Sequence, residues 1–78
     1  MPVLEVVVGF GPDHTRQLVA RRKELGLRQE DLALLAGVSE RFVRQLEAGK
    51  QTVRLDTLTA VLDALGLELA LVRREVRG

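Results

Sequence analysis

The chain has 78 residues, of which 46% are hydrophobic and 29% are charged, and its 12 basic and 11 acidic side chains leave a net charge of +1. This length allows one domain with a modest core, and the mixture of apolar and charged residues argues against a disordered chain. Without cysteine the chain has neither a disulfide framework nor a thiolate metal site. Nothing in the sequence suggests an oxidising compartment, and its longest apolar runs are far below the roughly 20 residues that span a bilayer, so we expect a cytoplasmic protein.

The first expected element is a short strand at Val3–Val8, a segment rich in β-branched apolar residues. Glycines and a proline follow it and break the chain. The sequence does not reveal which segment would pair with this strand. From about Asp13 to Leu25, a spacing of three to four residues predicts a helix, with Asp13 as its N-cap and Gly26 at its end.

Two short helices are predicted next. Gln29–Ala36 places leucines and alanines on one side and acidic residues in the first turn, where the helix dipole favours them. Gly37 ends this second helix. Ser39 then offers an N-cap oxygen to a third helix, whose buried stripe consists of Val43 and Leu46.

The last part of the chain predicts a helix followed by a strand. Leu55–Leu65 carries leucines at helical spacing and ends at Gly66, so this fourth helix belongs mainly to the core. Beyond it every second residue is a leucine, and this two-residue period is typical of a strand. We therefore expect the order strand, four helices, strand, within a single domain over residues 1–78.

The second and third predicted helices have the pattern of a helix-turn-helix motif at residues 29–48. Ala33 is small enough for the two helices to approach closely, and Gly37 can take the left-handed conformation that a sharp turn requires. Val43 and Leu46 would hold the third helix from beneath. The side chains left on its outer face are candidates for contacts with bases and phosphates, namely Glu40, Arg41, Arg44 and Gln45.

Residues 27–50 read LRQEDLALLAGVSERFVRQLEAGK and resemble the Xre or Cro/cI-type helix-turn-helix family. Residues 52–71 read TVRLDTLTAVLDALGLELAL and resemble the HipB-like antitoxin branch, whose members end in a strand after the last helix. The resemblance implies a mainly α, lambda-repressor-like DNA-binding domain of four to five helices with short terminal β-strands. One departure is Arg28, which stands where the family often has a serine or threonine N-cap.

The resemblance also implies which residues contact DNA. In such proteins the first glutamine of the second helix, here Gln29, contacts a phosphate, and the start of the third helix enters the major groove. The expected DNA-binding residues are Gln29, Ser39, Glu40, Arg41, Arg44, Gln45 and Lys50.

Arg22 requires a separate explanation, because it falls on the inward side of the first helix, where a buried charge needs a partner. The resemblance implies an ion pair between Arg22 and Glu47, which would fix how the third helix is presented. The alternative is that Arg22 contacts a phosphate. His14 is expected to be an ordinary helix-start residue, and Phe42 is expected to pack at the edge of the core rather than touch a thymine methyl group.

The leading functional hypothesis is sequence-specific operator binding by a symmetric dimer, with half-sites of palindromic double-stranded DNA one helical turn apart. Arg41 and Arg44 suit the two acceptors of guanine, and Glu40 could accept from cytosine. The resemblance further implies an antitoxin that represses its own operon and binds a HipA-like kinase toxin. The alternative is a protein-interaction adaptor on the same helices. We expect no enzyme, metal or cofactor, because the sequence has no nucleophile and base pair, phosphate loop or ligand cluster.

The expected dimer contact is the C-terminal strand, at about residues 67–74. A single strand cannot satisfy its own backbone groups, and an apolar edge invites pairing with a second chain. Leu67, Leu69 and Leu71 would then be buried in the dimer. The competing arrangement pairs residues 3–8 with residues 67–72 of the same chain, although an isolated two-stranded ribbon is only marginally stable.

Overall fold

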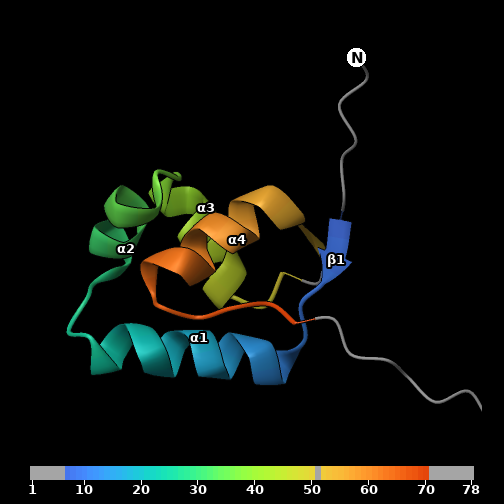
Figure 1. Cartoon of the computed structure of the whole chain (residues 1–78), viewed down its shortest axis with the longest axis horizontal. Helices are drawn as coiled ribbons and strands as arrows, with labels where there is room; N and C mark the ends of the chain where they lie inside the picture. The colour runs from blue at the N-terminus through green and yellow to red at the C-terminus, as the bar shows by residue number, and fades with distance from the viewer. Residues whose placement is uncertain (1–6, 51, 71–78) are drawn as a thin grey trace, which may run out of the picture.

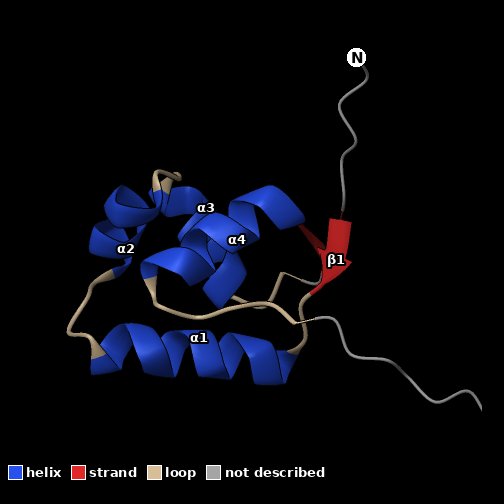
Figure 2. Cartoon of the chain, in the orientation of Figure 1, coloured by secondary structure: helices blue, strands red, loops and turns tan. Residues whose placement is uncertain are grey.

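The computed structural model describes residues 7–50 and 52–70. In chain order, its elements are β1 (Val7–Gly9), α1 (Pro12–Glu24), α2 (Gln29–Ala36), α3 (Glu40–Glu47), β2 (Thr52–Arg54) and α4 (Leu55–Ala64). Figure 1 shows α1 along one side, with α2, α3 and α4 grouped over it. The described residues are thus mainly helical, as predicted, and Figure 2 shows short loops between the helices. None of these helices is long and apolar enough to cross a membrane.

Within the described residues, all four helices and β2 contribute to one apolar core. Helical spacing turns one stripe of each helix inward, and the largest completely buried side chains are leucines and valines from these stripes. Val38 and Phe42 are partly buried and pack against the same core. Its buried members are Phe10, Leu18, Leu32, Ala33, Val43, Leu46, Val53, Leu58, Val61, Leu62 and Leu65.

The start of α1 differs from the prediction, because Gly11 and not Asp13 is the N-cap. Pro12 occupies the first helical position, where its fixed φ suits a helix and its missing N–H costs nothing. Asp13 lies in the first turn and pairs with the arginine three residues further on. His14 supplies the capping contact, since its Nδ1 accepts a hydrogen bond from the Gly11 N–H at 3.1 Å, and its ring centroid lies 5.5 Å from that of Phe10.

The ends of α2 and the start of α3 agree with the prediction. Arg28 cannot accept a capping hydrogen bond, but Asp31 Oδ2 accepts one from the Arg28 backbone N–H at 2.8 Å and so secures the first turn of α2. Gly37 ends that helix in the left-handed conformation, with φ at 69°. Ser39 caps α3, because its Oγ accepts from the Phe42 N–H at 3.0 Å.

Local and long-range contacts hold the two ends of α4. At its start, Asp56 Oδ1 accepts a hydrogen bond from the Thr57 backbone N–H at 2.8 Å. This bond, together with the nearby Arg54 guanidinium, lowers the pKa of the Asp56 carboxyl below its usual value. At the other end, Nε of Arg21 donates to the Leu65 carbonyl at 2.9 Å. A cation is favourable at this helix terminus, and the contact fastens α1 to α4.

β2 is the strand partner that the sequence did not reveal. It pairs with β1 in antiparallel order, with Val8 opposite Val53. β1 covers the end of the predicted strand and extends to Gly9, whereas residues 3–6 lie outside the described residues. The predicted alternative, an intramolecular ribbon between residues 3–8 and 67–72, is not formed by the described residues, because β1 pairs with β2 and residues 67–70 are not part of a strand.

Residues 67–70, the described part of the predicted C-terminal strand, have no regular secondary structure in the single chain. The N–H of Leu67 donates to the Leu62 carbonyl at 2.9 Å, and Leu67 packs against the core, whereas Leu69 is 53% exposed. Alternating leucines create an apolar edge, but a strand forms only where a partner accepts its hydrogen bonds. In Figure 1 this segment runs back between α4 and α1. Leu71 and the rest of the predicted strand, to residue 74, lie outside the described residues.

Candidate nucleic-acid interface

α3 has one buried face and one outer face. Val43 and Leu46 are completely buried, and Phe42 packs against the core rather than standing outward. Because these side chains fix the rotation of the helix about its axis, the opposite face must point away from the core. The side chains on that face are Glu40 and Gln45, which are half-buried, and Arg41 and Arg44, which are exposed.

Two residues of the outer face are joined to each other. Nη2 of Arg44 lies 3.0 Å from Oε1 of Glu40, one helical turn earlier. The side chains remain 62% and 42% exposed, respectively, so the pair stands in solvent. Such a pair between residues i and i+4 contributes only about 0.3–0.5 kcal/mol to helix stability. The contact therefore orients Arg44 without fixing it permanently.

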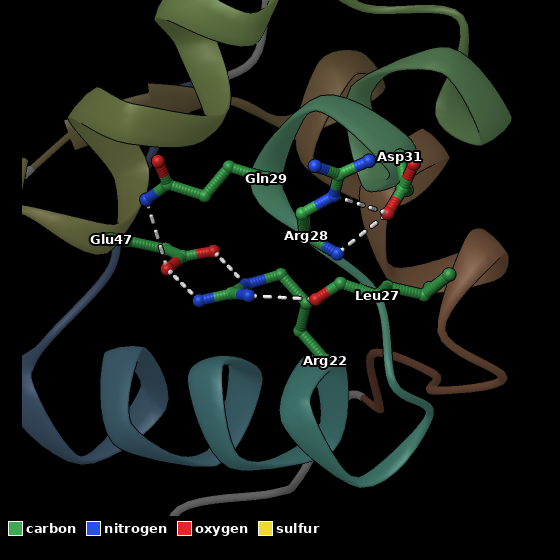
Figure 3. Close-up of polar contacts among 6 residues, drawn as sticks. All are labelled: Arg22, Leu27, Arg28, Gln29, Asp31 and Glu47. Carbon is green, nitrogen blue, oxygen red and sulfur yellow. Dashed lines mark hydrogen bonds and ion pairs between the residues drawn. The ribbon is translucent and has the colours of Figure 1, made fainter.

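The Arg22 and Glu47 side chains meet beneath α3, as the resemblance implied. Figure 3 shows the two parallel contacts, which join Arg22 Nε to Glu47 Oε2 at 2.7 Å and Arg22 Nη2 to Glu47 Oε1 at 2.9 Å. Arg22 Nη1 also donates to the Leu27 carbonyl at 2.8 Å. Only 11% of the Arg22 side chain and 6% of the Glu47 side chain are exposed. One buried, two-pronged contact thus links α1, the loop after it and the end of α3.

Gln29 joins the same contact, which sequence reasoning missed. Its Nε2 donates to Glu47 Oε1 at 3.2 Å, so the first residue of α2 reaches the last residue of α3 (Figure 3). A side-chain amide carries two N–H donors, and this bond uses one of them. The Glu47 carboxylate therefore holds the predicted phosphate-contacting side chain in one orientation. No local pattern reports such a contact, because it depends on how α2 packs against α3.

The remaining predicted DNA-binding residues lie around α3. Ser39 is exposed at its N-cap, and its hydroxyl is engaged in capping. Lys50 is exposed in the loop that follows, where its backbone N–H donates to the Gln45 carbonyl at 3.2 Å. The structure thus gathers all seven predicted residues on or next to α3. Within the described ranges, no group of three or more histidine, cysteine or acidic residues is placed to hold a metal ion.

Comparison of the sequence with known protein families identifies the family of this chain. A family model described as helix-turn-helix matches residues 18–72, which include α2, the turn at Gly37, α3 and α4. The chain therefore belongs to the helix-turn-helix family, and the prediction of an Xre-type helix-turn-helix is confirmed.

Two curated relatives carry the comparison further. The chain is 48% identical over 48 residues to the uncharacterized HTH-type transcriptional regulator y4mF of Sinorhizobium fredii, a match that covers 62% of this chain and 63% of that protein. It is 32% identical over 62 residues to an uncharacterized HTH-type transcriptional regulator of Haemophilus influenzae, a match that covers 80% of this chain and 63% of that protein. The chain thus spans less than two thirds of each relative.

Proposed function

We propose that this protein is a sequence-specific DNA-binding transcriptional repressor and that α3 enters the major groove. The observation that supports the proposal most is the outer face of α3, where Arg41 and Arg44 are exposed above the completely buried Val43 and Leu46. A rigid helix with arginines on its free face fits the width of the groove and the acceptors of guanine. The names of the two relatives, both HTH-type transcriptional regulators, support the same function.

Most of the predicted site residues have a direct or indirect role in DNA binding in this proposal. Arg41, Arg44 and Gln45 contact base edges, because their donors match the acceptors of guanine and adenine. Gln29 and Lys50 contact phosphates on either side of α3, and such contacts fix the position of the protein on the duplex. Arg22 and Glu47 contribute indirectly, since they hold α3 against α1.

We propose that the protein binds DNA as a symmetric dimer and that residues 67–74 form the contact between the two chains. The support is that residues 67–70 form no strand in the single chain, although Leu69 is 53% exposed there and alternates with Leu67 and Leu71. A second chain would supply the missing strand partner. Two-fold symmetry would then set the two α3 helices at one separation, which a palindromic operator matches.

We propose further that the protein is a HipB-like antitoxin that represses its own operon and binds a HipA-like kinase toxin. The support is the resemblance of residues 52–71 to that branch. The test is to identify the neighbouring gene and, where it encodes a kinase-like protein, to co-express both and measure whether they elute together. Separate elution of the two proteins would contradict this part of the proposal.

DNA binding itself is tested by selection from a random duplex library, followed by gel shifts at rising salt. Specific recognition predicts an enriched sequence that is bound at least about a thousandfold more tightly than a scrambled duplex. In a plot of log affinity against log salt concentration, each neutralised phosphate should make the negative slope steeper by about 0.9. Failure to enrich any sequence would contradict the proposal.

One observation favours the second candidate function, a protein-interaction adaptor. Leu34 and Leu35 on α2 are 83% and 62% exposed, and adjacent exposed leucines are typical of a contact surface. An apolar protein contact has a weak dependence on salt, unlike phosphate contacts. Under this candidate, Leu34→Glu would remove partner binding and the selection would enrich no DNA.

A further inference from the structure

Glu40 is an acidic residue at the start of α3, within the surface proposed to contact DNA. It lies in the first turn of α3, and Arg44 Nη2 lies 3.0 Å from its Oε1. The carboxylate would face a polyanion, and it also neutralises the neighbouring arginine. Its contact with Arg44 gives this carboxylate a way to affect DNA binding without touching the DNA.

The pair between Glu40 and Arg44 should affect the affinity for the specific DNA sequence and the affinity for arbitrary DNA differently. Affinity for arbitrary DNA comes almost entirely from cations that neutralise phosphates and release counterions. The pair with Glu40 lowers the share of this affinity that Arg44 contributes, because a phosphate that approaches Arg44 also approaches the carboxylate. A guanine edge is different, since it offers two neutral acceptors that match the guanidinium and carries no full charge.

Resting on the proposed function, we propose that Glu40 is a specificity-determining residue that acts through Arg44. Its carboxylate weakens the attraction of the Arg44 guanidinium to the phosphates of arbitrary DNA, while the guanidinium can still donate to a guanine edge. This role differs from direct recognition of cytosine by Glu40, which would not depend on Arg44.

The test compares the full chain with its Glu40→Gln variant, in which the side chain keeps its size but loses its charge. Affinities are measured by fluorescence anisotropy at several salt concentrations for two duplexes, the one that the wild type selects and a scrambled one of equal composition. We expect the variant to bind the scrambled duplex more tightly, by up to about eightfold at about 0.1 M salt, which is the effect of one released counterion. Its salt slope on that duplex should steepen by about 0.9 per chain, and its preference for the selected duplex should fall.

Two controls separate this role from a general effect of charge. Asp63→Asn removes the same charge from the exposed surface of α4 and should leave the preference unchanged. In the Arg44→Ala background, Glu40→Gln should no longer steepen the slope. Thermal melting of each variant checks that the fold is intact.

The possible failures are distinguishable. If the wild type selects no sequence, the proposed function fails and this inference fails with it. If the wild type is selective but Glu40→Gln leaves the slope and the preference unchanged, only the inference is overturned. A loss of affinity confined to one C·G pair, and equally large in the Arg44→Ala background, would overturn it in favour of direct cytosine recognition.

Discussion

Glu47 joins the end of α3 to α1 and α2 and so helps to fix the position of α3. Its carboxylate accepts hydrogen bonds from Arg22 at 2.7 and 2.9 Å and from Gln29 at 3.2 Å, and little of it is exposed. A buried ion pair is weak evidence of net stability, because desolvation of both charges offsets their attraction. Removal of one partner is costly, however, because the other charge is left buried without compensation.

We therefore predict that Glu47→Ala lowers the free energy of unfolding by about 3–5 kcal/mol. Glu47→Gln, which retains an acceptor for Gln29 but loses the charge, should cost less. Urea denaturation followed by circular dichroism measures both variants. An unchanged midpoint for Glu47→Ala would show that the buried contact does not stabilise the fold.

A substitution of Arg44 tests whether the outer face of α3 contacts bases. We predict that Arg44→Ala weakens binding to the selected duplex by about 1–3 kcal/mol, the contribution of one two-pronged base contact. Its melting temperature should stay close to that of the wild type, because the side chain is exposed. If the variant keeps its affinity and its discrimination at matched salt, Arg44 does not contact a base.

At the scale of elements, the turn between α2 and α3 depends on Gly37, whose φ is 69°. No atom lies within 4 Å of the position that a Cβ would take, so a side chain there meets open space and only backbone strain remains. We predict that Gly37→Ala costs about 1–2 kcal/mol and that Gly37→Asn costs less, because asparagine tolerates this conformation better. Thermal melting compares the two variants, and equal stability of Gly37→Ala and the wild type would contradict the expected strain.

The sequence was sufficient to predict those elements whose ends carry local signals. α2 has its predicted bounds, and Ser39 caps α3, because cap residues and glycines act within a few positions of themselves. The cap of α1 was assigned wrongly, since Pro12 next to Gly11 moves the helix start ahead of Asp13.

Long-range contacts could not be predicted in the same way. β1 and β2 have three residues each, which is too few to show a clear two-residue period. They pair with each other although α1, α2 and α3 separate them in the sequence. The contact between Gln29 and Glu47 likewise exists only after α2 and α3 have packed together. The outer face of α3 was predictable, because the spacing of Val43 and Leu46 within one helix defines the buried side and leaves the polar residues on the other side.

At the scale of the whole molecule, the proposed dimer depends on residues 67–74. We predict that Leu69→Glu converts the dimer to a monomer, because a carboxylate cannot be buried in an apolar strand contact without a partner. Leu34→Glu is the matched control, since Leu34 is also an exposed leucine but lies on α2, and it should leave the mass unchanged. Light scattering measures the mass of each variant. A Leu69→Glu variant that remains dimeric would place the dimer contact elsewhere.

The most direct test of DNA recognition by α3 is an NMR titration of the full chain with the duplex that it selects. The proposed function predicts the largest changes in amide chemical shift at residue 29 and at residues 39–45, with small changes along the exposed side of α4. It also predicts that Arg44→Ala reduces the changes across α3 at matched salt. Largest changes around Leu34 and Leu35, with α3 unaffected, would contradict the central claim that the outer face of α3 contacts DNA.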